Sequence, residues 1–128
     1  MRIGDRMTPN PCVVRLGDSL TTARMIMQAQ RFKHLPVVER KRVLGVISDR
    51  DVRQHAANLD DTVVESVMTA DPVTASPDTS VEEAASLMLV KGVGCLPVTE
   101  QGGLVGIITT TDLLRALLDI TRVHAKQT

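Results

Sequence analysis

The chain contains the segment GVISDRD at residues 45–51 and repeats its pattern sixty-one positions later as GIITTTD at residues 106–112. The same offset places the LPV of residues 35–37 over the LPV of residues 96–98. From residue 7 to residue 52 the alignment needs no gap, and 13 of its 46 positions are identical. A duplication of this kind predicts two similar halves related by a pseudo-twofold axis, with clefts between them occurring in pairs.

The composition indicates one folded domain that does not bind nucleic acid. With 128 residues, the two halves are expected to share a core. The proportions, 43% hydrophobic and 23% charged, are typical of a globular protein. The net charge is zero and Phe32 is the only aromatic residue. A nucleic-acid binder would need an excess of cations and rings on which bases can stack.

The cysteines and apolar runs indicate a cytoplasmic protein. Cys12 and Cys95 occupy non-equivalent positions in the two halves and form no Cys-x-x-Cys pattern. We therefore expect neither a disulfide nor a zinc site, and a reducing compartment. The longest apolar runs, such as residues 104–108, have the length of a strand, so no membrane span or signal peptide is predicted.

Each half predicts the order strand–helix–strand–strand–helix, an α/β arrangement with strands against one layer of helices. In the first half, after a proline-containing turn at 7–11, these elements are expected at residues 12–14, 20–30, 35–39, 43–48 and 49–57. The second half repeats the pattern and ends in a helix from residue 110 to about residue 121. The predicted divisions are 1–57 (first repeat), 58–62 (linker), 63–121 (second repeat) and 122–128 (fraying C-terminal tail).

The repeated motif Gly-h-h-[Ser/Thr]-x-x-Asp, where h is apolar, lies where a strand leads into a helix. The first N–H groups of a helix are unpaired and its dipole is positive there, which suits a phosphate. The hydroxyl of Ser48 or Thr109 can donate to an anion, and the carboxylate of Asp51 or Asp112 can accept from the two hydroxyls of a ribose. The same spacing is also typical of an ordinary helix cap. The residues alone leave both interpretations open.

The motifs in combination are more specific than any one of them. Met-Thr-x-x-Pro, then Leu-Pro-Val, then Gly-h-h-[Ser/Thr]-x-x-Asp resembles a tandem pair of cystathionine β-synthase (CBS) domains, also called a Bateman module. The resemblance covers about residues 1–121, and VGCLPV at 93–98 is most similar to the CBS pair of acetoin-utilisation proteins. It implies two pseudo-symmetric CBS repeats packed as one module.

The resemblance implies a regulatory protein that binds AMP, ADP or ATP, with or without Mg²⁺, in two clefts between the repeats. One repeat supplies the aspartate that binds ribose, and the other supplies most of the adenine wall. Cleft 1 is then expected to be lined by Ser48, Arg50, Asp51, Met68, Thr69, Val73, Val93, Gly94 and Cys95. Cleft 2 is expected to be lined by Thr109, Thr111, Asp112, Met7, Thr8, Cys12, Phe32, Lys33 and His34.

The two clefts are expected to differ in charge. Arg50 gives cleft 1 a fixed cation where its counterpart Thr111 gives cleft 2 only a hydroxyl. We therefore expect cleft 1 to tolerate more phosphate charge.

The expected partners are an adenine nucleotide, a target protein that the sequence does not identify, and a second copy of the chain. CBS pairs typically dimerise through their helices, and the apolar stripe from Leu113 to Leu118 offers a surface for a homodimer. No nucleophile, base and oxyanion donors come together, so we expect no catalysis and no catalytic cofactor. Two alternatives remain open. One is a ligand-free assembly module whose motifs are only helix caps, and the other is a module for S-adenosylmethionine or a metal ion.

Overall fold

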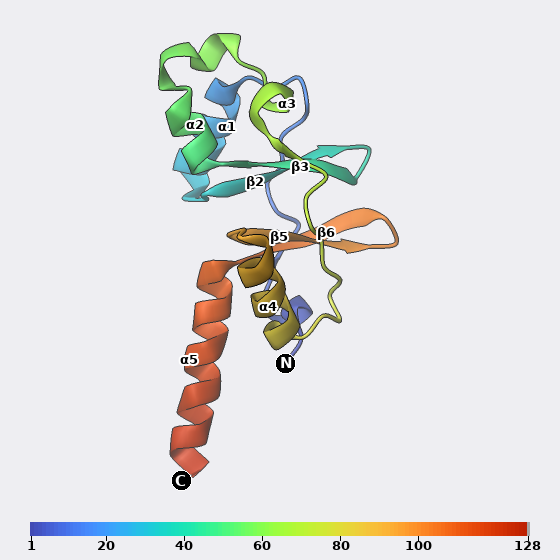
Figure 1. Ribbon diagram of the computed structural model, residues 1–128, viewed down its shortest axis with the longest axis vertical. Coiled ribbons are helices and arrows are strands. Elements are labelled where there is room, and N and C mark those ends of the chain that lie inside the picture. The colour runs from blue at the N-terminus through green and yellow to red at the C-terminus, as the bar shows by residue number, and fades with distance from the viewer. Residues whose placement is uncertain (128) are drawn as a thin grey trace.

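The computed structural model describes residues 1–127 and contains two three-stranded antiparallel sheets. One sheet has the order β2 (His34–Glu39), β3 (Arg42–Ser48) and β4 (Thr69–Ala70). The other has the order β5 (Cys95–Glu100), β6 (Gly103–Thr109) and β1 (Thr8–Pro9). The sheets lie in the middle of the molecule, with the helices on their outer sides (Figure 1). The expected α/β arrangement of two similar repeats is confirmed.

The main helices of the two repeats correspond in pairs, α1 with α4 and α2 with α5. The first sheet is covered by α1 (Leu20–Gln30), α2 (Asp49–Gln54) and the short α3 (Val64–Val67), and the second by α4 (Val81–Lys91) and α5 (Thr110–Gln127) (Figure 1). Two 3₁₀ helices, η1 (Ile3–Asp5) and η2 (Ala56–Asp61), complete the elements. None of the described helices is both long and apolar enough to cross a membrane.

Each repeat contributes an edge strand to the sheet of the other repeat. Thr8 pairs with Ile107 on β6, and Thr69 pairs with Val46 on β3. An edge strand tolerates Pro9, which has no N–H to donate. Residues 7–11 were expected to form only a turn, and the structure places Thr8–Pro9 in this strand instead. The two repeats are therefore interlocked.

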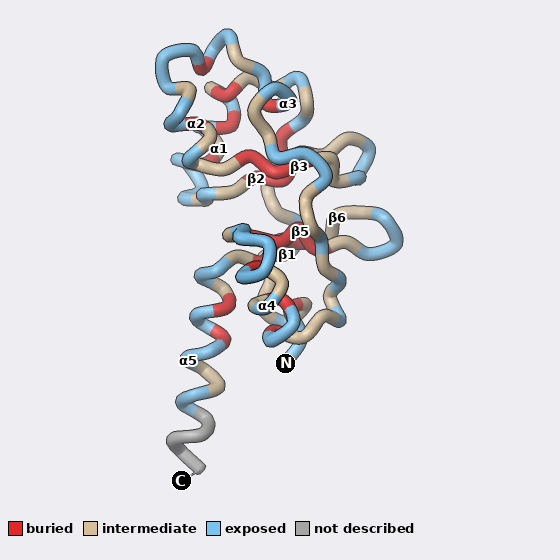
Figure 2. The backbone as a smooth tube through the Cα atoms, in the orientation of Figure 1, coloured by how far each residue is buried: buried red, intermediate tan, exposed pale blue. Residues whose placement is uncertain are grey.

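The buried residues form two cores with a small contact between them. The first core contains Leu35, Ile47 and, from the second repeat, Val64. The second contains Leu96, Ile108 and, from the first repeat, Ile3. Figure 2 shows the buried segments along the central strands and on the inner faces of the helices. A third cluster joins the sheets and consists of Val46, Cys95 and Ile107. Because each core takes residues from both repeats, neither repeat has a complete core of its own.

Several element boundaries differ from the sequence expectation. The strand expected at residues 12–14 is a single parallel bridge between Val14 and Val37. The helix expected to end near Ala57 ends at Gln54, and η2 covers most of the expected linker. The last helix continues to Gln127 rather than ending near 121, since residues 122–127 contain neither glycine nor proline. Residue 128 of the expected tail lies outside the described residues.

Candidate functional site

Both strand-to-helix junctions form the helix cap that their spacing suggested. The Oδ2 atom of Asp51 accepts hydrogen bonds from the backbone N and from the Oγ of Ser48, both at 2.8 Å. Ser48 Oγ in turn accepts from the Asp51 backbone N at 3.1 Å. In the second repeat, Asp112 Oδ2 accepts from the Thr109 N at 2.9 Å and from its Oγ1 at 3.0 Å. The interpretation of both motifs as helix caps is therefore confirmed.

The caps do not use the whole carboxylate. Within the part of the chain that the structure describes, every side-chain hydrogen bond to Asp51 and Asp112 ends on Oδ2. The Oδ1 atom of each aspartate keeps its capacity to accept, and both residues are only half-buried. Capping and binding of a diol are therefore compatible at the same residue.

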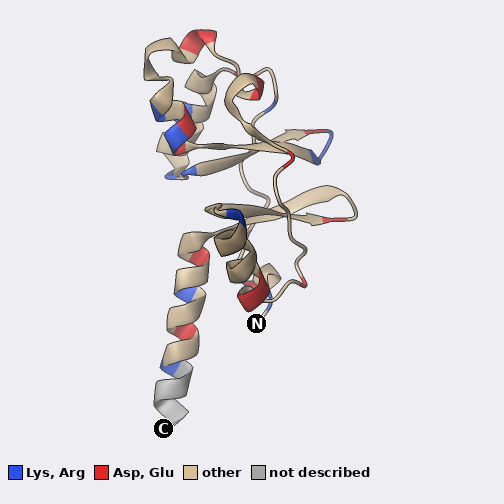
Figure 3. Cartoon of the chain, in the orientation of Figure 1, with Lys and Arg blue, Asp and Glu red and all other residues tan. Residues whose placement is uncertain are grey.

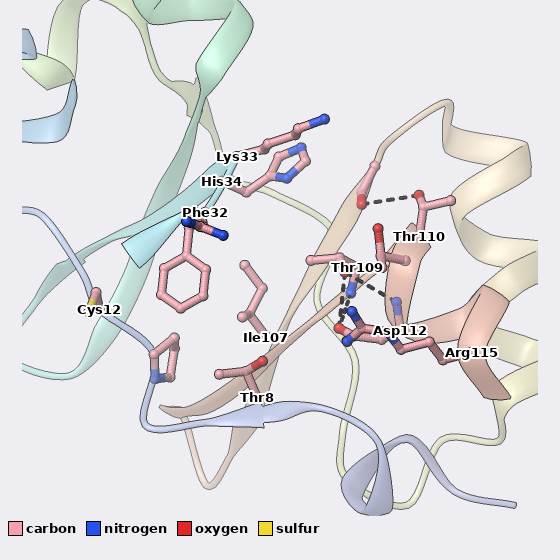
Figure 4. Close-up of a pocket in the computed structure, with 14 residues that line it drawn as sticks. Thr8, Cys12, Phe32, Lys33, His34, Ile107, Thr109, Thr110, Asp112 and Arg115 are labelled. Atoms are coloured by element: carbon pink, nitrogen blue, oxygen red, sulfur yellow. Dashed lines mark hydrogen bonds between the residues drawn. The ribbon is translucent and has the colours of Figure 1, made fainter. Parts of the chain in front are cut away.

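A cavity of about 490 Å³ lies between the repeats beside Asp112 (Figure 4). We call it the Asp112 cavity. It is lined by Thr8, Pro11, Cys12, Arg31, Phe32, Lys33, His34, Gly94, Ile107, Thr109, Thr110, Thr111, Asp112 and Arg115. Eight of the nine residues expected in cleft 2 line it. The ninth, Met7, packs against the second core and over Gly106 instead.

The lining of the Asp112 cavity is divided by polarity. Figure 4 shows Phe32, Cys12 and Ile107 on one side and Thr109 and Asp112 on the other. The apolar side can cover a flat ring, and the polar side offers hydroxyl groups and a carboxylate acceptor. Its volume lies within the range of small-molecule sites in proteins. This arrangement suits a ligand with an apolar ring at one end and a polar, charged group at the other.

Burial suppresses charge on two groups near the centre of the molecule. It lowers the pKa of His34 below the ordinary value, although Asp51 partly opposes the shift. It also raises the pKa of the Cys95 thiol to about 12. His34 is therefore a neutral wall residue at neutral pH. A β-carbon at Gly94 would lie 3.2 Å from the Nε2 of His34, so glycine allows the imidazole ring to approach the backbone there.

The sequence interpretation missed cations around the Asp112 cavity. Arg31 and Arg115 line it together with Lys33. Arg115 lies three residues after Asp112, which is almost one helical turn, so helical spacing could have identified it. The expected charge difference between the two clefts, which contrasted Arg50 with Thr111, did not take Arg31 and Arg115 into account. That expectation compared one pair of residues, and the cations come from other positions.

Some of the residues expected in cleft 1 lie close together. The Ser48–Asp51 cap stands at the end of β3, and Thr69 is paired to that strand opposite Val46. Cys95 is buried against Val46 at the contact between the sheets.

The other residues expected in cleft 1 are distributed over the molecule. Met68 packs against the first core, and Val73 packs against the second. Gly94 lines the Asp112 cavity, and Val93 and Arg50 are exposed. Cleft 1 as a ligand site stays a prediction. Among the side chains of residues 1–122, which the structure describes, no three His, Cys, Asp or Glu groups come close enough together to hold a metal ion.

Two interlocked repeats with paired caps and a ligand-sized cavity between them define a duplicated α/β binding module. The family model of the CBS domain matches residues 3–58 and again residues 64–119. The chain therefore belongs to the CBS domain family and carries a tandem pair of these domains.

Solved structures of CBS pairs share this fold. CBSX2 of Arabidopsis thaliana, crystallised in complex with AMP, is 32% identical, with a TM-score of 0.83 over 94% of this chain and 98% of that one. A putative acetoin utilisation protein (AcuB) from Vibrio cholerae is 28% identical, with a TM-score of 0.84 over 98% and 96%. The CBS pair of protein MJ0100, in complex with 5'-methylthioadenosine and S-adenosylmethionine, is 25% identical, with a TM-score of 0.85 over 91% and 99%.

CBS pairs also occur within longer proteins. A homoserine O-acetyltransferase of Methanococcoides burtonii is 34% identical over 117 residues, which are 90% of this chain but 24% of that enzyme. CBS pairs are generally regulatory modules rather than catalytic ones, and some of them are fused to enzymes.

Proposed function

We propose that this chain is a non-catalytic regulatory module of the cytoplasm that binds AMP, ADP or ATP. The nucleotide occupies the Asp112 cavity, either free or as its Mg²⁺ complex, and cleft 1 is its pseudo-symmetric counterpart. The observation that carries the proposal is Asp112, which lines a cavity with one apolar and one polar side and whose Oδ1 accepts no side-chain or cap hydrogen bond in the described part of the chain. Two similar CBS pairs that have been crystallised with adenosine compounds support the class of ligand.

In this proposal, each side of the cavity binds a different part of the nucleotide. Asp112 Oδ1 accepts hydrogen bonds from the ribose hydroxyls while Oδ2 keeps the cap. Phe32 and Ile107 cover the adenine ring with apolar surface. Thr111 lines the cavity on the first turn of α5, where the helix dipole favours phosphate. The hydroxyls of Thr109 and Thr110 donate to Asp112 and to the carbonyl of Gly94. The cationic lining favours such a phosphorylated ligand over S-adenosylmethionine, which has a sulfonium charge and no phosphate.

A thermal-shift screen with AMP, ADP, ATP and S-adenosylmethionine tests the proposal. A ligand at one hundred times its Kd adds about 2.7 kcal/mol of stability. For a domain of this size, the melting temperature should rise by several degrees. No shift with any of the four compounds would contradict the proposal and favour the ligand-free assembly module.

Two asparagine variants separate the cap from the ligand site. Asp112→Asn keeps one side-chain oxygen for the cap, but it replaces the second acceptor with an amide that donates. Without ligand, this variant should melt at nearly the same temperature as the wild type. With nucleotide, it should lose the rise in melting temperature that binding in the Asp112 cavity gives. Asp51→Asn makes the same change at the other cap. Because cleft 1 is also a proposed nucleotide site, the control is the melting temperature of this variant without ligand, which measures what the exchange costs at a cap.

An exposed apolar surface supports the homodimer that was expected from the sequence. On α4, Leu89 is 83% exposed and Val90 is 77% exposed. On α5, Leu114, Leu117 and Leu118 are each more than half exposed. An apolar patch of this kind typically marks an interaction site.

The first repeat has no equivalent of this apolar surface. The counterparts of these five residues are Gln28, Ala29, Arg53, Ala56 and Ala57. The proposed dimer therefore joins second repeat to second repeat, and a target protein would respond to how ligand changes the packing of the repeats. Leu117→Glu should yield a monomer in light scattering, whereas Ala56→Glu at the equivalent position should not. A wild-type monomer would contradict this part of the proposal.

A further inference from the structure

We propose that the Asp112 cavity selects nucleotides with a diphosphate or triphosphate chain, and that Arg31, Lys33 and Arg115 bind that chain. This inference rests on the proposed function, because it specifies which class of adenine nucleotide the cavity takes. It assigns the higher phosphate charge to the Asp112 cavity, opposite to the expectation from Arg50 alone. All three cations line the one cavity and come from both repeats.

The duplication provides an internal comparison for these cations. The alignment of the repeats gives each of the three cations a counterpart in the other repeat. Those counterparts are Gly92, Gly94 and Gln54. None of the three is charged, so the cationic set is specific to one side of the module. Three cations but only one carboxylate, that of Asp112, line the Asp112 cavity, so its lining carries an excess of positive charge.

The three cations are not engaged elsewhere in the described part of the chain. The ion pairs there use other arginines, and no side-chain hydrogen bond involves Arg31, Lys33 or Arg115. Acidic and basic residues alternate along α5 (Figure 3). Asp119, one turn after Arg115, pairs with Arg6 and Arg122 instead. Unneutralised cations around one cavity create a positive potential that attracts a multivalent anion.

Arg31 keeps its place in the cavity at a conformational cost. It ends α1 with φ 59° and ψ 38°, in the left-handed region. Its counterpart Gly92 ends α4 with φ 67° and ψ 38°. Glycine adopts this conformation without steric strain, whereas an arginine does not. Replacing Arg31 with glycine should therefore relieve this strain and, at the same time, remove a cation from the lining of the cavity.

The number of cations exceeds what one phosphate needs. A guanidinium group binds phosphate oxygens through two parallel hydrogen bonds, so two arginines and a lysine suit successive phosphates. AMP offers one phosphate, while ADP and ATP extend the chain past the ribose. We therefore expect the affinity to rise from AMP to ADP to ATP. The preference should weaken as salt is added, because the three cations are exposed and screened by ions.

Calorimetric titration of AMP, ADP and ATP into three proteins tests this inference. The variants Arg31→Gly and Arg115→Gln replace each cation with the residue of the other repeat. Wild type should bind ATP at least about tenfold more tightly than AMP, because AMP lacks the phosphates that make one or two of the charge-assisted contacts. Each variant should reduce that ratio by about fivefold, because it weakens the binding of ATP more than the binding of AMP.

Arg31→Gly has a second readout that a merely structural residue would not give. Its unliganded form should melt at a higher temperature than wild type while its preference for ATP falls. Arg40→Gly is the matched control, because Arg40 also has a positive φ of 50° but does not line the cavity. It should raise the melting temperature and leave the ratio of ATP to AMP affinity unchanged.

The outcomes distinguish this inference from the proposed function. If AMP and ATP bind wild type equally well, or if neither Arg31→Gly nor Arg115→Gln changes the ratio, the inference is wrong and nucleotide binding stands. If no nucleotide binds wild type, both are wrong. Lower thermal stability of Arg31→Gly would contradict the argument from strain.

Discussion

Thr8 of the first repeat lies opposite Ile107 of the second in an antiparallel pair, so the beginning of the chain completes the sheet of the other half. The strand exchange that both repeats share explains why a glycine begins each motif, Gly45 in the first and Gly106 in the second. A β-carbon at Gly106 would lie 3.0 Å from the carbonyl oxygen of Thr8 and would meet the side chain of Met7. At Gly45 it would lie 2.9 Å from the carbonyl oxygen of Thr69. Each glycine therefore makes room for the exchanged strand.

We expect Gly106→Ala to destabilise the protein by about 1–3 kcal/mol, the usual cost of forcing extra atoms into a packed site. Because a backbone oxygen is among the close atoms, a change of side-chain rotamer does not relieve the contact. Urea denaturation measures the change in the free energy of unfolding. Gly17→Ala is the control, since a β-carbon there meets nothing within 4 Å. Equal stability of the two variants would contradict the packing role of Gly106.

The turn between β2 and β3 offers a stabilising change. Arg40 and Lys41 both have positive φ, at 50° and 68°, as the favoured two-residue hairpin turn requires. The counterpart of Lys41 is Gly102, with φ 81°. Lys41→Gly should therefore raise the free energy of unfolding by about 0.5–1 kcal/mol. The reverse change, Gly102→Lys, should lower it. Thermal melts of both variants test whether stability rises in Lys41→Gly and falls in Gly102→Lys. A lower melting temperature of Lys41→Gly would contradict this prediction.

His34 should make stability depend on pH. Burial lowers its pKa in the folded state, so below the ordinary value near 6.5 the unfolded chain binds a proton more readily than the folded one. The stabilising contribution is complete above pH 6.5 and is lost as pH falls through the lowered pKa of His34. Denaturation of wild type and His34→Gln between pH 5 and pH 8 tests this expectation. The wild type should lose more stability toward pH 5, and parallel profiles would show that His34 does not contribute.

The local elements could be predicted from the sequence, because they depend on short-range signals. Ser19 and Ser80 precede their helices and cap them, and the paired apolar runs form the two hairpins. The exchange of edge strands could not be predicted in this way. Thr8–Pro9 is only two residues long and pairs with a strand almost one hundred residues later, so neither periodicity nor turn residues indicate it.

The residues of the candidate site also differ in whether they could be predicted from the sequence. Asp112 and Thr109 follow from the motif, and the resemblance to CBS pairs supplied Phe32 and His34. Arg31 was missed because its place in the cavity depends on a left-handed backbone at the end of α1, where a helix usually ends in glycine. Such a conformation becomes visible only in the folded chain.

The reactivity of Cys12 tests nucleotide binding in the Asp112 cavity most directly. Cys12 lines the cavity, whereas burial raises the pKa of Cys95 to about 12 and leaves that thiol unreactive. A thiol reagent should therefore modify Cys12 selectively. We predict that ATP slows this modification in wild type and does not slow it in Asp112→Asn. An unchanged rate in wild type with millimolar AMP, ADP and ATP would contradict the account.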